Sequence, residues 1–228
     1  NLGEERLAIV VEMVIDVDGT LRDSEIYRAW VTNHAKLAYN GVAAWLEGSA
    51  GPLEAIAAVK GLDETLRLQD RTAQEMKTRR HIHGALSLET IEAKPVFEGD
   101  QLRALDIDEK NRAREIIEDF MIAANGVTAR YLSARRFPSI RRVVRTPKRW
   151  DRIVAIAAEH KSHLPETPDS RALDEFLVKE RAADPVRFPD LSLAVIKLLG
   201  SGEYIAELPE GNAPGHFGLA VKDYAHST

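Results

Sequence analysis

The segment Glu109–Ser133, which reads EKNRAREIIEDFMIAANGVTARYLS, decides the fold class because it carries the clearest helical pattern in the chain. At 100° per residue its large apolar side chains fall on one broad face, as in a helix that packs on a core. The members of this face are Ile116, Ile117, Phe120, Met121, Ala124 and Val127. The pattern therefore predicts one long helix.

The opposite side of this predicted helix is mixed rather than freely charged. Glu118, Ile122 and Asn125 share that side because they are spaced i, i+4 and i+7. A carboxylate and an amide beside an isoleucine indicate either a partly covered polar site or an ordinary solvent-facing side. Periodicity alone leaves both interpretations open.

Shorter elements lie on both sides of the long helix in the sequence. Apolar, β-branched runs and turn residues predict strands at Leu7–Ile15, Leu21–Trp30, within Ala85–Ile107 and at Phe217–Val221. Apolar residues at helical spacing predict helices at Lys36–Leu46, from Pro52 onward, and at Trp150–His160, Ser170–Arg181 and Leu191–Gly200. We therefore expect an α+β fold, with a mixed or largely antiparallel sheet packed against several helices.

Composition narrows the classes of function. The chain has 228 residues, a net charge of −5 and no cysteine, which excludes disulfides, thiolate zinc sites and a cysteine nucleophile. No apolar run reaches membrane-spanning length. Although the chain is acidic overall, Arg135–Arg149 reads RRFPSIRRVVRTPKR, with seven basic residues and no acid. Arg141, Arg142 and Arg145 could grip phosphates, or the window could be a solvated strand edge that resists aggregation.

An aspartate motif follows the first predicted strand. Val14–Ser24 reads VIDVDGTLRDS and resembles the first motif of haloacid-dehalogenase-type phosphatases. In that family the residue matching Asp16 attacks a phosphoryl group, and the residue matching Asp18 is a general acid/base. The alternative is a hairpin turn, which favours aspartate and glycine for backbone reasons. We favour the turn, because no convincing acidic pair follows a later strand.

A second resemblance extends along nearly the whole chain and depends on the order and spacing of several matching segments. It is to the ribonuclease II / ribonuclease R family, whose catalytic unit is the RNB domain. The matching segments are His34–Tyr39 (HAKLAY), Trp45–Gly48 (WLEG), Arg80–Leu86 (RHIHGAL), Ile117–Asn125 (IEDFMIAAN), Pro214–Leu219 (PGHFGL) and Tyr224–Thr228 (YAHST).

This resemblance implies a cytoplasmic exoribonuclease that hydrolyses single-stranded RNA from the 3′ end, uses Mg²⁺, and releases nucleoside 5′-monophosphates. Glu118 matches the family's active-site glutamate, which contacts the terminal ribose, and Tyr39 matches a tyrosine that shares this role. The 2′-hydroxyl at that position distinguishes RNA from DNA. We add Asn125, Arg141, Arg142 and Arg145 as candidate RNA-binding residues.

The sequence also departs from the family. We do not find the family's metal-binding aspartates or its catalytic arginine in residues 1–228, so we expect no metal ligands within this chain. Residues 1–228 then correspond to the central portion of the catalytic domain, without the flanking OB-type RNA-binding domains, and are expected to be inactive alone. Leu88 stands where bacterial ribonuclease II has a base-clamping aromatic, which predicts weaker retention of short products. A catalytically dead RNA-binding protein remains an alternative.

Overall fold

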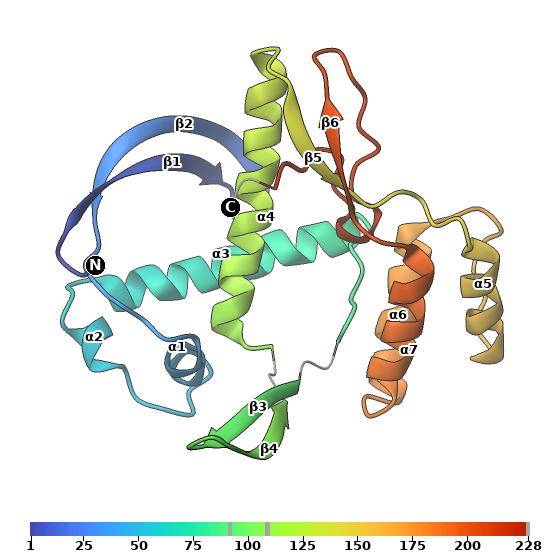
Figure 1. Ribbon diagram of the computed structural model, residues 1–228, viewed down its shortest axis with the longest axis horizontal. Coiled ribbons are helices and arrows are strands. Elements are labelled where there is room, and N and C mark those ends of the chain that lie inside the picture. The colour runs from blue at the N-terminus through green and yellow to red at the C-terminus, as the bar shows by residue number, and fades with distance from the viewer. Residues whose placement is uncertain (91–92, 108–109, 227–228) are drawn as a thin grey trace.

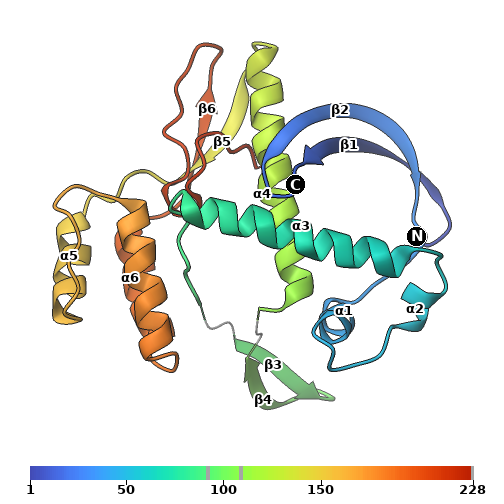
Figure 2. The same cartoon turned by 180° about the vertical axis from the view of Figure 1, so that it is seen from behind.

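The computed structural model describes residues 1–90, 93–107 and 110–226. Within these ranges the chain forms seven α-helices and three antiparallel two-stranded sheets (Figures 1 and 2). The predicted α+β class is confirmed. The strands pair as three separate sheets, of which β1–β2 and β3–β4 are hairpins, rather than as one sheet.

Most elements follow the sequence predictions, with differences at their ends, but strand β6 was not predicted. The helices are α1 (Tyr39–Leu46), α2 (Glu54–Ala57), α3 (Leu62–Ile82), α4 (Arg112–Ala134), α5 (Trp150–Glu159), α6 (Ser170–Ala183) and α7 (Phe188–Leu199). The strands are β1 (Glu5–Ile15), β2 (Leu21–Thr32), β3 (Ala93–Glu98), β4 (Gln101–Ile107), β5 (Ser139–Val143) and β6 (Glu203–Glu207).

The last predicted strand is wrong. Phe217–Leu219 forms a short 3-10 helix, η1, in place of a strand. The side chain of His216 accepts a hydrogen bond from the Leu219 amide, and Ala220 takes a left-handed conformation, so the backbone bends tightly here. The predicted start of the long helix, Glu109, lies outside the described residues.

Helix α4 is the central element of the fold. Figure 1 shows it crossing α3, with the arched β1–β2 hairpin on one side and β5–β6 on the other. Since neighbours pack on more than one side of α4, the predicted separation into an apolar face and a mixed face is only partly right. Ile116 and Val127 are buried as predicted, but Ile117 is exposed and Ile122 is buried.

Two apolar clusters hold the outer helices. One lies among α5, α6 and α7, where Ile153, Leu177 and Val195 are fully buried, and the other joins α1 and α2 to the start of α4. Burying a side chain of this size contributes about 1.5–3 kcal/mol. The second cluster also fixes the start of α4, which forms one wall of the site described below.

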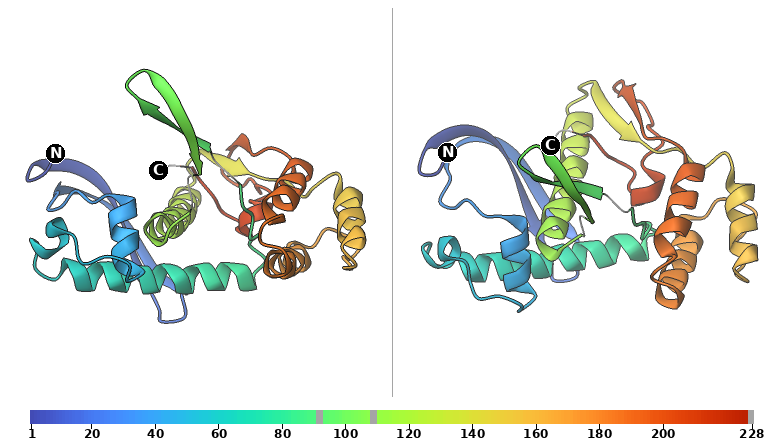
Figure 3. Two further views of the ribbon diagram at one scale, coloured as in Figure 1. Left: turned by 90° about the horizontal axis from the view of Figure 1, so that it is seen from below. Right: turned by 60° about the horizontal axis from the view of Figure 1, so that its bottom comes forward.

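An extended segment links α3 to the first cluster. The Ser87 amide donates to Asp174 Oδ1 on α6 at 2.7 Å, and the Glu89 amide donates to Ser192 Oγ on α7 at 2.7 Å. The sequence predicts strands in this region, but the Ser87 and Glu89 amides bond to helix side chains, and the Leu86 amide donates to the Gly218 carbonyl at 2.9 Å. The β3–β4 hairpin beyond it projects away from the helices (Figure 3).

The Asp16–Thr20 segment is a hairpin turn, as favoured from the sequence. The Gly19 amide donates to the Asp16 carbonyl at 3.0 Å, and the Thr20 amide donates to Asp18 Oδ1 at 3.0 Å. Hydrogen bonds from the Thr20 hydroxyl and then from the Thr20 amide hold the pKa of Asp18 below its ordinary value, and the charge of Arg79 adds to this effect. The Asp18 carboxylate thus serves the turn itself, and the Asp16 carboxylate lies 3.5 Å from Arg22 Nη1 at the start of β2. In the described part of the chain, no helix is long and apolar enough to cross a membrane.

Candidate functional site

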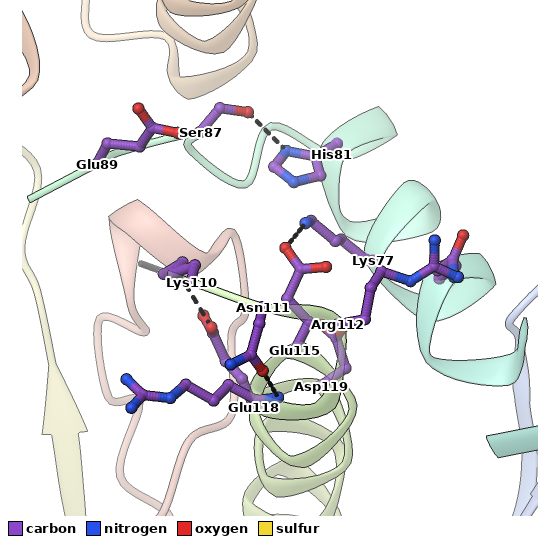
Figure 4. Close-up of polar contacts among 12 residues, drawn as sticks. Lys77, His81, Ser87, Glu89, Lys110, Asn111, Arg112, Glu115, Glu118 and Asp119 are labelled. Atoms are coloured by element: carbon purple, nitrogen blue, oxygen red, sulfur yellow. Dashed lines mark hydrogen bonds and ion pairs between the residues drawn. The ribbon is translucent and has the colours of Figure 1, made fainter. Parts of the chain in front are cut away.

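A cavity of about 470 Å³ opens between α3, α4 and the extended segment before β3. We call it the α3–α4 cavity. Helix α3 contributes Lys77, Arg80 and His81, and α4 contributes Glu115, Glu118 and Asp119. Each set has the spacing i, i+3, i+4, which places three side chains on one helix face. Basic residues on one helix therefore face acidic residues on the other (Figure 4).

Ion pairs cross this cavity. Lys77 Nζ lies 2.6 Å from Glu115 Oε1, and Arg80 Nη2 pairs with Asp119 Oδ1. Lys110, just before α4, places its Nζ 3.1 Å from Glu118 Oε2. The carboxylate of Glu118 is thereby held at the cavity wall while remaining half-exposed to solvent.

A second, more open groove of about 510 Å³ lies on the other side of Glu118. We call it the Tyr39 groove. Its lining comprises Tyr39, Arg114, Ile117, Glu118, Met121, Ile122, Arg142, His216, Leu219 and Tyr224. The structure therefore brings together three of the sequence-predicted site residues, Tyr39, Glu118 and Arg142. The Arg114 guanidinium lies 5.8 Å from the centre of the Tyr39 ring.

The other predicted RNA-binding residues lie elsewhere. Asn125 is fully buried, and its amide donates to the Tyr224 hydroxyl at 3.4 Å. Arg141 is 2% exposed and binds Glu207, the Ala129 carbonyl and Ser133 Oγ. Neither side chain can reach RNA from this position, so we withdraw both from the candidate set. Arg145 is exposed, pairs with Glu203 at 3.2 Å, and lines neither cavity.

Arg141, Val143 and Arg145 alternate with Arg142 and Val144 in the sequence, which predicts a strand with one cationic face, and the burial of Arg141 shows that this prediction is wrong at Arg141. On β5, Arg141 and Val143 point to the buried side, and Arg142 alternates to the side of the Tyr39 groove. The sequence gives no sign of this burial, because the partner Glu207 comes from a strand more than sixty residues later.

Sequence reasoning also missed two residues of the site. Lys110 falls in the first turn of the predicted helix, where the apolar periodicity gives it no role, and in the structure it lies just before α4. Tyr224 reaches the Tyr39 groove through the chain's return after η1, where the Arg142 amide donates to the Tyr224 carbonyl at 3.1 Å. Only the i, i+3, i+4 spacing of Lys77, Arg80 and His81 could have indicated the α3 wall in advance.

Among the residues that line the Tyr39 groove, His216 has a strongly lowered pKa. Burial, followed by the charge of Arg142, lowers the pKa of His216 from 6.5 to about 4. Its Nδ1 accepts from the Leu219 amide, so protonation there removes an acceptor. Its ring also meets the Tyr224 ring edge-on at 5.7 Å.

We expect the folded state to lose stability as the pH falls from 6.5 toward 4, since the unfolded chain takes up the proton of His216 first. Above pH 6.5 this contribution is fully present. Urea unfolding of the native protein that contains residues 1–228 measures it, with His216→Asn as the comparison. The free energy of unfolding should fall less steeply with acidification in the variant. Parallel curves for the two proteins would assign the acid sensitivity to other groups.

The fold and the paired cavities define a helix-rich α+β unit with a carboxylate–tyrosine site. Residues 1–228 match the model of the RNB domain along their whole length, and the chain belongs to this family. It is 31% identical to ribonuclease R of Escherichia coli (strain K12), over 98% of this chain and 27% of that protein. It is 30% identical to exoribonuclease 2 of Escherichia coli (strain UTI89 / UPEC), over 97% of this chain and 34% of that protein. The chain thus spans about a quarter to a third of these relatives.

Solved structures agree on the fold. The apo form of Mycoplasma genitalium RNase R matches with a TM-score of 0.85 at 20% identity, over 99% of this chain and 34% of that one. The same protein in complex with double-stranded RNA also gives a TM-score of 0.85, as does its complex with ribose-methylated single-stranded RNA. The resemblance to the ribonuclease II / ribonuclease R family is confirmed, and the fold corresponds to part of the RNase R catalytic domain.

Proposed function

We propose that the native protein containing residues 1–228 is a 3′-to-5′ exoribonuclease that hydrolyses single-stranded RNA to nucleoside 5′-monophosphates. In this proposal the chain is the central portion of the catalytic domain. The observation that carries it is the meeting of Tyr39 and Glu118 in one groove, although they come from different helices almost eighty residues apart. Membership of the RNB family supports the same activity.

The groove suits the 3′-terminal nucleotide. A Glu118 carboxylate oxygen can accept a hydrogen bond from the ribose 2′-hydroxyl, which DNA lacks. The Tyr39 ring can stack on a sugar or base while its hydroxyl donates to a second oxygen. Arg142, on the same groove, can bind a phosphate oxygen. These residues bind and orient the substrate and select ribose.

Mg²⁺ is implied by the family, where it would assist hydrolysis. In residues 1–90, 93–107 and 110–226, no group of three or more His, Asp or Glu side chains could hold a metal ion. The described residues therefore do not fit a magnesium site, and we assign no step of the reaction to a metal held by them. We expect the ligands to come from other parts of the native protein.

Product analysis tests the proposal. The native protein is incubated with Mg²⁺ and a 5′-labelled single-stranded RNA, or with DNA of the same sequence. We expect RNA shortened stepwise from the 3′ end, nucleoside 5′-monophosphates as products, and little loss of DNA. Internal cleavage, or release of 3′-phosphates, would contradict the proposal. RNA binding without hydrolysis would identify a catalytically dead RNA-binding protein instead.

A further inference from the structure

Arg80 differs from the other cations of the α3–α4 cavity. Its side chain is only 18% exposed, and its partner Asp119 is 3% exposed. Lys77, Lys110 and Arg181 line the same cavity, but their side chains are well exposed to solvent. A cation that water does not solvate interacts more strongly with an anion that enters the cavity.

The guanidinium of Arg80 also uses only part of its hydrogen-bonding capacity. An arginine has five N–H donors, and here Nη2 meets a single oxygen of Asp119. Its Nε is shielded from solvent and has no hydrogen-bond partner among the described residues. Burial lowers the pKa of Arg80, and the nearby Glu118 and Tyr224 oppose that effect. The group is thus fixed and desolvated before any ligand binds.

The position of Arg80 relative to Glu118 indicates which part of an RNA chain it could bind. Asp119, which anchors Arg80, follows Glu118 directly on α4, and both Arg80 and Glu118 line the α3–α4 cavity. A ribose held by Glu118 would carry its phosphodiester to within the same cavity, because the two groups are adjacent in a nucleic-acid chain. A guanidinium is well suited to the non-bridging oxygens of that phosphodiester.

We propose that Arg80 is a phosphate-binding residue of the α3–α4 cavity, which holds the RNA phosphodiester nearest to the ribose bound by Glu118. Asp119 is its positioning partner. This inference rests on the proposed function, because it requires RNA to enter the site.

The chain offers a matched control for the structural role of this ion pair. Arg112 on α4 pairs with Asp70 on α3, with Arg112 Nε 3.0 Å from Asp70 Oδ1. This pair also joins the two helices, but neither residue lines the α3–α4 cavity or the Tyr39 groove. Arg112→Met therefore removes a cross-link of the same kind without removing the proposed phosphate contact.

The experiment measures binding of a 5′-fluorescein-labelled single-stranded RNA to the native protein in EDTA, over a range of salt concentrations. Each phosphate contact contributes about 0.7 to the slope of log affinity against log salt for a single strand. We expect Arg80→Met to lower the slope by about 0.7 and to weaken affinity roughly tenfold at low salt. Arg112→Met should leave the slope unchanged.

Equal slopes for the wild type and Arg80→Met would overturn the inference while leaving RNA binding intact. No RNA binding by the wild type would instead contradict the proposed function. Circular dichroism checks that Arg80→Met folds. If the unpaired Asp119 prevents folding, the double change Arg80→Met/Asp119→Leu removes both buried charges. This double variant is compared with Arg112→Met/Asp70→Leu. A lower salt slope for Arg80→Met/Asp119→Leu alone supports the inference, and equal slopes overturn it.

Discussion

Replacing Glu118 with glutamine in the native protein is expected to lower kcat/KM on single-stranded RNA by about 10- to 100-fold. A hydrogen bond to a charged group contributes about 1.5–3 kcal/mol, and each 1.4 kcal/mol is a factor of ten. The amide keeps the shape of the side chain but loses the charge that strengthens the hydrogen bond donated by the ribose hydroxyl. The loss should be smaller on RNA that ends in a 2′-deoxynucleotide, since that substrate never makes the bond.

The measurement is kcat/KM for two RNAs that differ only in the terminal 2′-hydroxyl. Glu175→Gln is the control, because Glu175 is exposed and pairs with Arg171 on the surface of α6. It should behave as the wild type does on both RNAs. If Glu118→Gln retains wild-type rate and discrimination, Glu118 does not contact the terminal ribose. An equal loss on the two RNAs would assign Glu118 to a role other than sensing the 2′-hydroxyl.

Local signals explain which parts of the fold could be predicted. The β1–β2 hairpin and α4 depend on short-range patterns, namely β-branched runs around an Asp-Gly turn and apolar residues at helical spacing. Both are present as expected. The 3-10 helix at Phe217 was missed because its bend depends on His216 capping its own backbone, which no periodicity encodes.

The candidate site could likewise be predicted only in part from the sequence. Tyr39 and Glu118 were found through resemblance of whole segments to a family, and the structure places both in one groove. Arg141 and Asn125 were selected for residue type and helix face, but long-range partners bury both of them. Charge in a sequence window does not tell which arginine of a strand points inward, because that depends on the strand's neighbours.

Replacing Gly19 with alanine is expected to destabilise the native protein by about 3 kcal/mol. Two effects add at this turn. Gly19 has φ of 77°, where a Cβ is unfavourable, and a Cβ there would lie 2.5 Å from the Glu75 carbonyl carbon on α3. The neighbouring atom is backbone, so the clash is relieved only by lifting the hairpin tip off the helix.

Gly3→Ala separates these two effects. Gly3 has φ of 75°, almost the same conformation, but a Cβ there would meet nothing within 4 Å. It should cost only about 1 kcal/mol, the usual penalty for a left-handed residue with a side chain. Urea unfolding of both variants gives the difference, which measures the seating of the hairpin tip on α3. Equal losses would mean that the tip does not rest on the helix. A larger loss for Gly19→Ala would show that the Asp-Gly-Thr segment is a packed structural turn, which accounts for its glycine without any phosphatase chemistry.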